Sequence, residues 1–467
     1  MMQFHSTHPA RLLSGLLLGL TTLVSAPSAN AQPTIAAATA AVTTVWAYSP
    51  TCTPQDYPDV PARPFLVAAP AGSTVLWFAA NSNGAYAGVG MGTSPDILAK
   101  LQRGTAAGAG CVSWLPAASY AGSTPSTYNS GLWMVAPFTA DGTNIQALIH
   151  NEFHGEWTGD TSWCWQQTSI IYLPCSYWNI VSAASVDAGV GFQLRQQAAA
   201  PGTNVPAIAL GDPYQPPSSL RPTNLPQGMT AQSNILQSGD YYYVLVQQLP
   251  FQPSGTTPSP QNGVCIYRAP VPTSPGQPLA WSGWGGSGYT VTVPASYPAG
   301  ASLPLCQPVL DAPFRFSWSI NTVLGQLILI GQDTLTAMEK HGVTLDGCPY
   351  APGATTTTAD EAFVYMTAIL DQATGTLSPT SQEACLLQIN SIANWQADTT
   401  RTGHAYPSLL DPTSPQLMAG DRNFQYSGAL PFLYFTQLNP VGPGNPHGFD
   451  RDLVRMPLAV SLLAGAK

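Results

Sequence analysis

Three side chains that can transfer protons or bind a metal stand two residues apart in one short stretch: His150, Glu152 and His154. They follow an apolar segment, 132–138, and a turn signal at Asp141-Gly142, a pattern that predicts the second strand of a β-hairpin. Because side chains on a strand alternate between faces, all three point to one side. Two imidazoles and a carboxylate on one face fit acid–base chemistry or metal binding. A structural hydrogen-bond cluster is the alternative.

The same three side chains form a candidate metal set. Two histidines with one carboxylate favour zinc or manganese, whereas calcium prefers oxygen ligands. We expect no cofactor to be required, and a divalent metal ion in a central funnel is the alternative. Other chemistries lack their signatures: the chain has no Gly-x-Ser-x-Gly elbow, no glycine-rich phosphate loop, no dinucleotide fingerprint and no Cys/His spacing for structural zinc.

The charge balance argues against two classes of partner. The chain of 467 residues has 14 basic and 23 acidic residues, a net charge of −9, and only 8% of its residues are charged. No basic stripe is present to neutralise phosphates, so we expect neither nucleic acid nor a membrane surface as a partner. A surface built from uncharged polar residues suits neutral polar ligands.

The first 31 residues have the pattern of an export signal. Arg11 precedes an apolar run, Leu12–Val24, and Ala29-Asn30-Ala31 is a small-x-small cleavage motif. The run is too short to span a bilayer, so we expect a mature chain that begins at Gln32 and is secreted or periplasmic. Residues 32–44 are expected to be a flexible lead-in.

Eight cysteines follow the predicted signal. An even number in an exported chain indicates up to four disulfides. Their connectivity is formally open. Pairing between sequence neighbours is the simplest arrangement, with Cys164–Cys175 the closest pair.

One pattern recurs along the rest of the chain: a strand with small or polar residues, a turn, and a second apolar strand that ends in polar residues. It occurs at 63–81, 132–152, 232–247, 315–331 and 424–437. The spacing fits a four-stranded blade with insertions, so we predict an all-β fold, a five-bladed β-propeller with long loop insertions and few short helices. It forms a single domain over 45–467. Tandem β-sandwiches are the rival architecture, and the helix candidates are 94–103 and 381–397.

Two further segments support a propeller. Ser185–Phe192 resembles the Asp-box of sialidase-like propellers, Ser-x-Asp-x-Gly-x-Thr-Trp, with Gly191 and Phe192 in the last two places. In that family the box is a turn away from the catalytic funnel, which implies a structural role for Asp187. The segment Asp450–Leu458 is a strand that can complete a blade and close the ring, with its charges in a local salt-bridge cluster.

The whole pattern resembles the five-bladed propeller glycoside hydrolases of families 43, 62 and 117. The resemblance implies a central funnel, a general base on the first inner strand, and an acid from a middle blade, usually Glu or, in family 117, His. Asp59 matches the base, with Asp56 second, and a turn role is the alternative for both. Glu152 matches the proton donor, with its pKa raised by burial. His150 or His154 is the alternative acid.

Other residues are assigned to substrate binding on the same resemblance. Arg63 is expected to pair with the base or bind a ligand oxygen, and Arg422 to reach the funnel ahead of the fifth repeat. Asn151 lies between the two histidines, and Asn234 and Trp318 stand where such an enzyme can carry carboxylates. Candidate platforms for sugar stacking, each with a core role as the alternative, are Trp133, Trp157, Trp178 and Trp318.

Three functions remain open. The first is an exported carbohydrate-active hydrolase that cleaves glycosidic bonds in an oligosaccharide or polysaccharide with an Asp/Glu or Asp/His pair. The second is a non-catalytic propeller that binds a glycan or a protein partner. The third is a metal-assisted lyase or hydrolase that uses His150, Glu152 and His154. A monomer is the working expectation for the oligomeric state.

Overall fold

The computed structural model describes residues 33–37, 42–52, 57–69, 72–81, 84–90, 96–105, 108–111, 127–154, 176–195, 208–210, 227–230, 233–249, 262–274, 276–292, 305–310, 317–441 and 450–462. The predicted export signal lies outside these residues. So do Asp56, Trp157, Cys164 and Cys175.

Strands dominate the described residues, which confirms the all-β prediction. The helices among them are short: α2 (Leu335–Lys340), α3 (Ile392–Ala397) and α4 (Pro415–Met418). Each begins at a hydroxyl side chain that accepts a hydrogen bond from the first turn. The helix predicted at 94–103 is wrong, because its described part is a turn followed by a strand. The helix predicted at 381–397 is a strand up to Ile389 and a helix only from Ile392.

The first sheet is an antiparallel meander that contains the first predicted repeat. Its strands, in order, are β3 (Phe65–Ala69), β4 (Gly72–Asn81), β5 (Gly84–Gly90), β6 (Leu101–Thr105) and β7 (Gly108–Ala109).

The second sheet contains the predicted catalytic hairpin. β8 (Leu132–Thr139) and β9 (Ile145–His154) pair antiparallel around the Asp141-Gly142 turn, as predicted, and β10 (Ser176–Ser185) pairs with β9. A parallel pair between Trp178 and Gly228 joins β10 to the rest of the sheet. The other strands are β11 (Gln193–Leu194), β12 (Ile208–Leu210), β13 (Gln227–Thr230), β14 (Leu236–Ser238), β15 (Tyr241–Leu249), β16 (Gly263–Pro270), β17 (Ser282–Gly283) and β18 (Val291–Thr292).

The third sheet contains the fourth predicted repeat. β19 and β20 form its hairpin, and β21 carries the sheet outward to β22 and β23. The strands are β19 (Ser317–Asn321), β20 (Gln326–Thr334), β21 (Glu361–Leu370), β22 (Leu377–Pro379), β23 (Ala384–Ile389) and β25 (Tyr426–Ser427).

The fifth predicted repeat is wrong in its first strand. The segment 424–427 does not form a hairpin with 431–437, because β25 runs parallel to β19 in the third sheet. The partner of β26 (Phe432–Leu438) on that side is instead β24 (Gly403–Leu410). The apolar residues at 424–427 resemble a hairpin strand, but their hydrogen bonds go to the neighbouring sheet.

The last sheet joins the two ends of the described chain. β27 (Arg451–Leu462) pairs with β26 on one side, as the predicted closing strand requires. Its other side pairs with β1 (Pro33–Ala37) and β2 (Thr43–Trp46). The predicted flexible lead-in therefore contains two paired strands in its described part.

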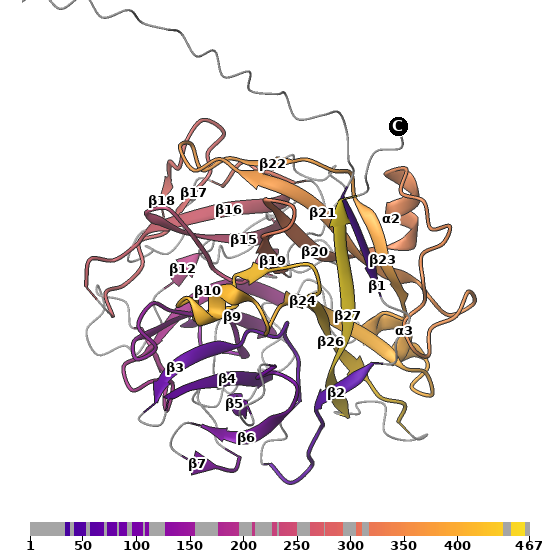
Figure 1. Ribbon diagram of the computed structural model, residues 1–467, viewed down its shortest axis with the longest axis horizontal. Coiled ribbons are helices and arrows are strands. Elements are labelled where there is room, and N and C mark those ends of the chain that lie inside the picture. The colour runs from indigo at the N-terminus through magenta and orange to yellow at the C-terminus, as the bar shows by residue number, and fades with distance from the viewer. Residues whose placement is uncertain are drawn as a thin grey trace, which may run out of the picture.

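The sheets follow one another around the molecule in chain order, from indigo β3–β7 to yellow β27 (Figure 1). The fold is thus a β-propeller with few short helices. The number of five blades stays a prediction, because the parallel pairing of β10 and β13 merges two of the predicted repeats into one eleven-stranded sheet.

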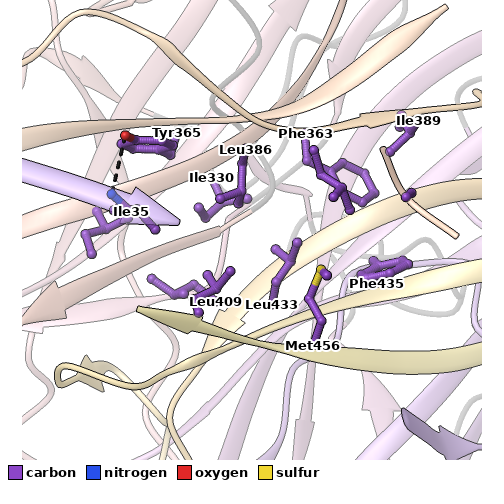
Figure 2. Close-up of a cluster of buried hydrophobic side chains, with 14 of the residues drawn as sticks. Ile35, Ile330, Phe363, Tyr365, Leu386, Ile389, Leu409, Leu433, Phe435 and Met456 are labelled. Atoms are coloured by element: carbon purple, nitrogen blue, oxygen red, sulfur yellow. Dashed lines mark hydrogen bonds between the residues drawn. The ribbon is translucent and has the colours of Figure 1, made fainter. Parts of the chain in front are cut away.

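The core lies between neighbouring sheets. Figure 2 shows one such layer, where β20, β21 and β23 pack against β24, β26 and β27 through buried aliphatic and aromatic side chains. Ile35 of β1 extends this layer, and its backbone N–H donates to the hydroxyl of Tyr365 at 3.4 Å. The first strand of the described chain is therefore part of the core.

Disulfides link sequence neighbours, as the simplest pairing predicts. The described bonds are Cys52–Cys111, Cys265–Cys306 and Cys348–Cys385. Among the described residues, no helix has the length and hydrophobicity needed to cross a membrane.

Candidate functional site

The β9 strand brings His150, Glu152 and His154 together on one face. His154 Nε2 lies 2.8 Å from Glu152 Oε1, and His150 Nε2 lies 3.5 Å from Glu152 Oε2. Ser176 on β10, directly opposite His154, places its Oγ 3.0 Å from His154 Nδ1. The strand alternation predicted from the sequence thus produces one carboxylate held between two imidazoles.

The pKa of Glu152 shifts in the direction opposite to the one predicted for a proton donor. Burial raises the pKa of this carboxyl, but the hydrogen bonds and charges of His150 and His154 outweigh burial and hold its pKa well below the usual range. The physical reason is that two positive or hydrogen-bonding partners stabilise the ionised form more than burial penalises it. Any proton donated from this cluster must therefore come from an imidazole.

Two indole rings enclose His150. Trp133 is its cross-strand partner on β8, with ring centroids 5.7 Å apart, and Trp178 on β10 meets it edge-on at 5.5 Å. Gly131 makes this packing feasible, because a Cβ at that position would lie 2.6 Å from the Trp133 ring and 2.8 Å from the Glu152 carbonyl oxygen. Trp133 is buried and Trp178 is partly exposed, so Trp178 is the ring that a ligand can reach.

Asp59 also contacts Trp133. Its Oδ2 accepts a hydrogen bond from the indole N–H of Trp133 at 3.1 Å, and its Oδ1 accepts one from the Tyr406 hydroxyl at 3.1 Å. Arg451 completes the set with an ion pair to Oδ1 and packs its guanidinium over the ring of Tyr57. The side chains of Asp59 and Glu152 are each 16% exposed, so both carboxylates keep some access to solvent.

The hydroxyl of Tyr406 interacts with the charges of both carboxylates, Asp59 and Glu152. Burial raises the pKa of Tyr406 well above its usual value, and the charges of Asp59 and, more weakly, Glu152 raise it further. Its backbone has a φ of 58° at a bulge in β24, between Ala405 and Ser408. A non-glycine residue in this region is strained, and such strain gathers at functional sites.

The sequence did not identify Tyr406 or the role of Arg451. Arg451 was expected in a local salt-bridge cluster, but it pairs with Asp59, which lies 392 positions away in the chain. The signal for Tyr406 was weak, because Tyr406-Pro407 interrupts the alternation of β24.

Polar atoms without hydrogen-bond partners gather at this place among the described residues. They include His150 Nδ1, Trp178 Nε1, the Asn151 side-chain oxygen, and both polar atoms of the Asn179 amide. Buried polar groups in proteins are nearly always hydrogen-bonded, so such a group points to a water molecule or a ligand. His150 Nδ1 and Trp178 Nε1 lie next to Glu152, whereas Asn151 and Asn179 belong to the opposite strand face.

Two predicted binding residues are buried. Arg63 donates to the Ala62 carbonyl at 3.0 Å and to Ser408 Oγ at 2.8 Å, and burial lowers the pKa of its guanidinium to about 9. Asn151 faces away from the histidines and donates to the Ser130 carbonyl. Their hydrogen bonds position the backbone around the site, since Ser408 is two residues from Tyr406.

Three other predicted residues do not join the site. Trp318 is fully buried, and its indole N–H donates to the Asn234 carbonyl at 2.7 Å. The Asn234 amide in turn bonds the backbone of Trp318, so the pair joins two strands and stacks on no sugar. Arg422 lines a polar cavity of about 400 Å³ next to Thr139, at the far end of β8 from Trp133. Six residues of strand separate them, about 20 Å.

A metal ion shared by His150, Glu152 and His154 has weak support. Glu152 already accepts from both imidazoles, one at each oxygen. Among the described residues, the three side chains that converge closely enough to hold one ion are Asp333, His341 and Glu383, which belong to the third sheet.

Comparison with known proteins gives similarities of fold alone. No protein-family model and no curated protein sequence matches the chain. A GH32 β-fructofuranosidase of Bombyx mori is 11% identical over 90% of this chain, with a TM-score of 0.39, and the match spans 63% of that enzyme. The catalytic domain of a GH62 α-L-arabinofuranosidase of Coprinopsis cinerea is 9% identical over 89% of this chain and 97% of that one, with a TM-score of 0.37. A family 117 glycoside hydrolase of Zobellia galactanivorans is 15% identical over 68% of this chain and 67% of that one, with a TM-score of 0.27.

Proposed function

We propose that the protein is an exported hydrolase that cleaves glycosidic bonds in neutral oligosaccharides at the site formed by Asp59, Trp133 and the His150/Glu152 pair. The proposal rests on one observation: a carboxylate, Asp59, and a carboxylate-supported imidazole, His150, both contact the indole ring of Trp133. Glycoside hydrolysis requires one base and one acid on opposite sides of the scissile bond. Aromatic rings beside them suit the apolar faces of sugars.

Asp59 takes the role of base. A carboxylate has about four lone-pair positions, and Trp133, Tyr406 and Arg451 use three of them. The remaining position, on Oδ2, can accept a proton from a water molecule. Three donors also fix the orientation of the carboxylate, which general-base catalysis requires.

His150 takes the role of acid. Its Nε2 faces the ionised Glu152, and its Nδ1 has no hydrogen-bond partner among the described residues. In its protonated form this imidazole carries an Nδ1–H that can pass its proton to the leaving oxygen. Water then attacks the anomeric carbon, Asp59 takes its proton, the C–O bond breaks and the leaving group departs as an alcohol. His154 is held on both nitrogens, by Ser176 and Glu152, and orients Glu152.

The substrate class follows from the charges of the site. Its ionised groups, Asp59, Arg451 and Glu152, are already paired with one another or with histidines. Little free charge is left for an anionic or cationic ligand, whereas the ring of Trp178 is partly exposed. An uncharged sugar that stacks on this ring fits best. The disulfides support export, because such bonds persist in oxidising compartments.

The test is to incubate the purified protein with a panel of neutral oligosaccharides in water enriched in heavy oxygen, and to analyse the products by mass spectrometry. A hydrolase places the heavy oxygen at the new reducing end. A lyase gives an unsaturated product without it. His150→Ala should abolish product formation, while Asp398→Asn, which removes the carboxylate of an exposed Asp–Arg pair, should leave it unchanged. Binding of an oligosaccharide without any product would overturn the proposal in favour of a glycan-binding propeller.

A further inference from the structure

We infer that Asp333, His341 and Glu383 form a binding site for one divalent transition-metal ion, with Zn²⁺ the best fit. Each residue offers one ligand atom, and the three atoms all lie within 4.8 Å of one another. Asp333 near the end of β20 and His341 at the C-cap of α2 belong to one continuous segment, and Glu383 precedes β23 in a separate one. The contact of Glu383 with the other two is therefore long-range in sequence and not the product of a local turn.

The spacing is close to that of a loaded site. Ligand atoms about 2.1 Å from a tetrahedral zinc ion are about 3.4 Å apart. The three ligand atoms lie within 4.8 Å of one another, so each pair must approach by at most about 1.4 Å to hold one ion. The mixed set, one imidazole and two carboxylates, favours zinc or manganese over calcium, which prefers oxygen ligands alone.

Glu383 supplies an independent observation. Its Oε1 is buried and has no hydrogen-bond partner among the described residues. A carboxylate oxygen is an obligate acceptor when ionised, so a buried and unmatched one is costly. A cation between the carboxylates of Asp333 and Glu383 would remove this penalty.

The surroundings suit a small ion with water ligands. Glu383 lines a cavity of about 490 Å³, whose wall also includes Gly342 and Val343, the two residues after His341. The histidine is exposed, so an ion can enter from solvent.

The site is separate from the proposed catalytic site and has a different role. α2 lies at the rim of the molecule on the right of Figure 1, whereas β9 and β10 lie toward the middle. An ion here ties α2 to β20 and to the start of β23, next to the Cys348–Cys385 disulfide. We assign it a stabilising role, because binding to the folded state alone shifts the unfolding equilibrium.

The test uses the full chain, dialysed against EDTA and titrated with ZnCl₂ by calorimetry, alongside thermal unfolding with and without the ion. We expect one zinc per chain and a rise in Tm on the order of several degrees. His341→Ala and Asp333→Asn should weaken binding more than about 100-fold, since even supporting residues of metal sites change affinity 10- to 100-fold. Asp346→Asn, an exposed acid on the same cavity wall, is the matched control and should bind zinc like the wild type.

Two results would overturn the inference. One is the absence of zinc or manganese binding below millimolar concentration. The other is unchanged zinc affinity in both His341→Ala and Asp333→Asn, which would place any bound ion elsewhere. A stronger response to CaCl₂ than to ZnCl₂ would contradict the class of ion. None of these measurements depends on hydrolytic activity, so the metal site can be confirmed or refuted independently of the proposed function.

Discussion

Tyr406 holds a backbone conformation that costs of order 1–3 kcal/mol in a non-glycine residue, and its hydroxyl donates to Asp59. Tyr406→Phe keeps the ring and removes the hydroxyl that makes this hydrogen bond. A hydrogen bond to a charged acceptor contributes about 1.5–3 kcal/mol, so we expect the free energy of unfolding to fall by about that amount. Urea denaturation measures it. Tyr426→Phe, whose hydroxyl has no hydrogen bond to the described residues, should change stability by less than about 0.5 kcal/mol.

The lowered pKa of Glu152 predicts how the free energy of unfolding changes with pH. Its pKa in the folded protein is below the value of 4.5 that an unfolded Glu has, so the folded state favours the ionised form. The stability that ionised Glu152 adds is complete above the unfolded pKa of 4.5 and is lost as the pH falls toward the lower folded pKa. We expect Glu152→Gln to destabilise by about 2 kcal/mol or more at pH 6, and the difference from the wild type to shrink below about pH 4.

Urea denaturation of Glu152→Gln and the wild type at several pH values measures this difference in the free energy of unfolding. A difference that stays constant or grows as the pH falls would contradict the ionised state of Glu152. It would restore the proton-donor role that the sequence suggested.

At the scale of single elements, the β8–β9 hairpin depends on Gly131. Gly131→Ala forces a Cβ against the Trp133 ring and the Glu152 carbonyl, so we expect a loss of about 2–3 kcal/mol and a change in tryptophan fluorescence. Gly239→Ala is the matched control, since Gly239 also has a positive φ but nothing lies within 4 Å of its Cβ position. It should cost only about 1 kcal/mol. Equal losses in the two variants would show that backbone strain, and not the close approach, explains the glycine.

The hairpin was predictable, whereas β24 was not, for reasons of local pattern. Residues 145–154 follow an apolar strand and an Asp-Gly turn, so the hairpin was predictable, and the spacing of two between His150, Glu152 and His154 places them on one face. β24 contains Pro407 and a bulge, which break the alternation that marks a strand. The segment 424–427 resembles a hairpin strand more closely than β24 does, because Phe424 and Tyr426 alternate with polar residues. The helix predicted at 94–103 failed because a three-residue apolar spacing also fits a turn that leads into a strand.

At the scale of the whole molecule, closure of the ring depends on β1. Ile35 is buried in the core layer of Figure 2, and its strand pairs with β27. Ile35→Asp places an unpaired charge in this core and should lower the free energy of unfolding by at least about 3 kcal/mol. Ala36→Asp, on the exposed face of the same strand, should change it by less than about 1 kcal/mol. Thermal unfolding compares the stability of the two variants. Similar losses of stability in Ile35→Asp and Ala36→Asp would show that β1 is dispensable.

The propeller was predictable from repeats, but the composition of the site was not. Repetition of a hairpin is a local property that sequence spacing reveals. The partners of Asp59 come from the far end of the chain, with Tyr406 separated by 347 positions and Arg451 by 392. Only ring closure brings these segments together, and no local pattern encodes which residues meet. Arg422 and Trp318 lie away from the site for the same reason. Sequence spacing does not show that Trp318 is fully buried, or that Arg422 lies near the far end of β8.

Whether Asp59 is the base of a hydrolase can be measured from the turnover of Asp59→Asn. The variant and the wild type are compared on one oligosaccharide, with binding measured separately by calorimetry. We expect kcat to fall by ~10²–10⁴ while the dissociation constant changes little, because the base acts on water and not on the sugar. Asp398→Asn, which removes the carboxylate of an exposed Asp–Arg pair, should have the wild-type rate. A wild-type kcat in a folded Asp59→Asn protein would contradict the account.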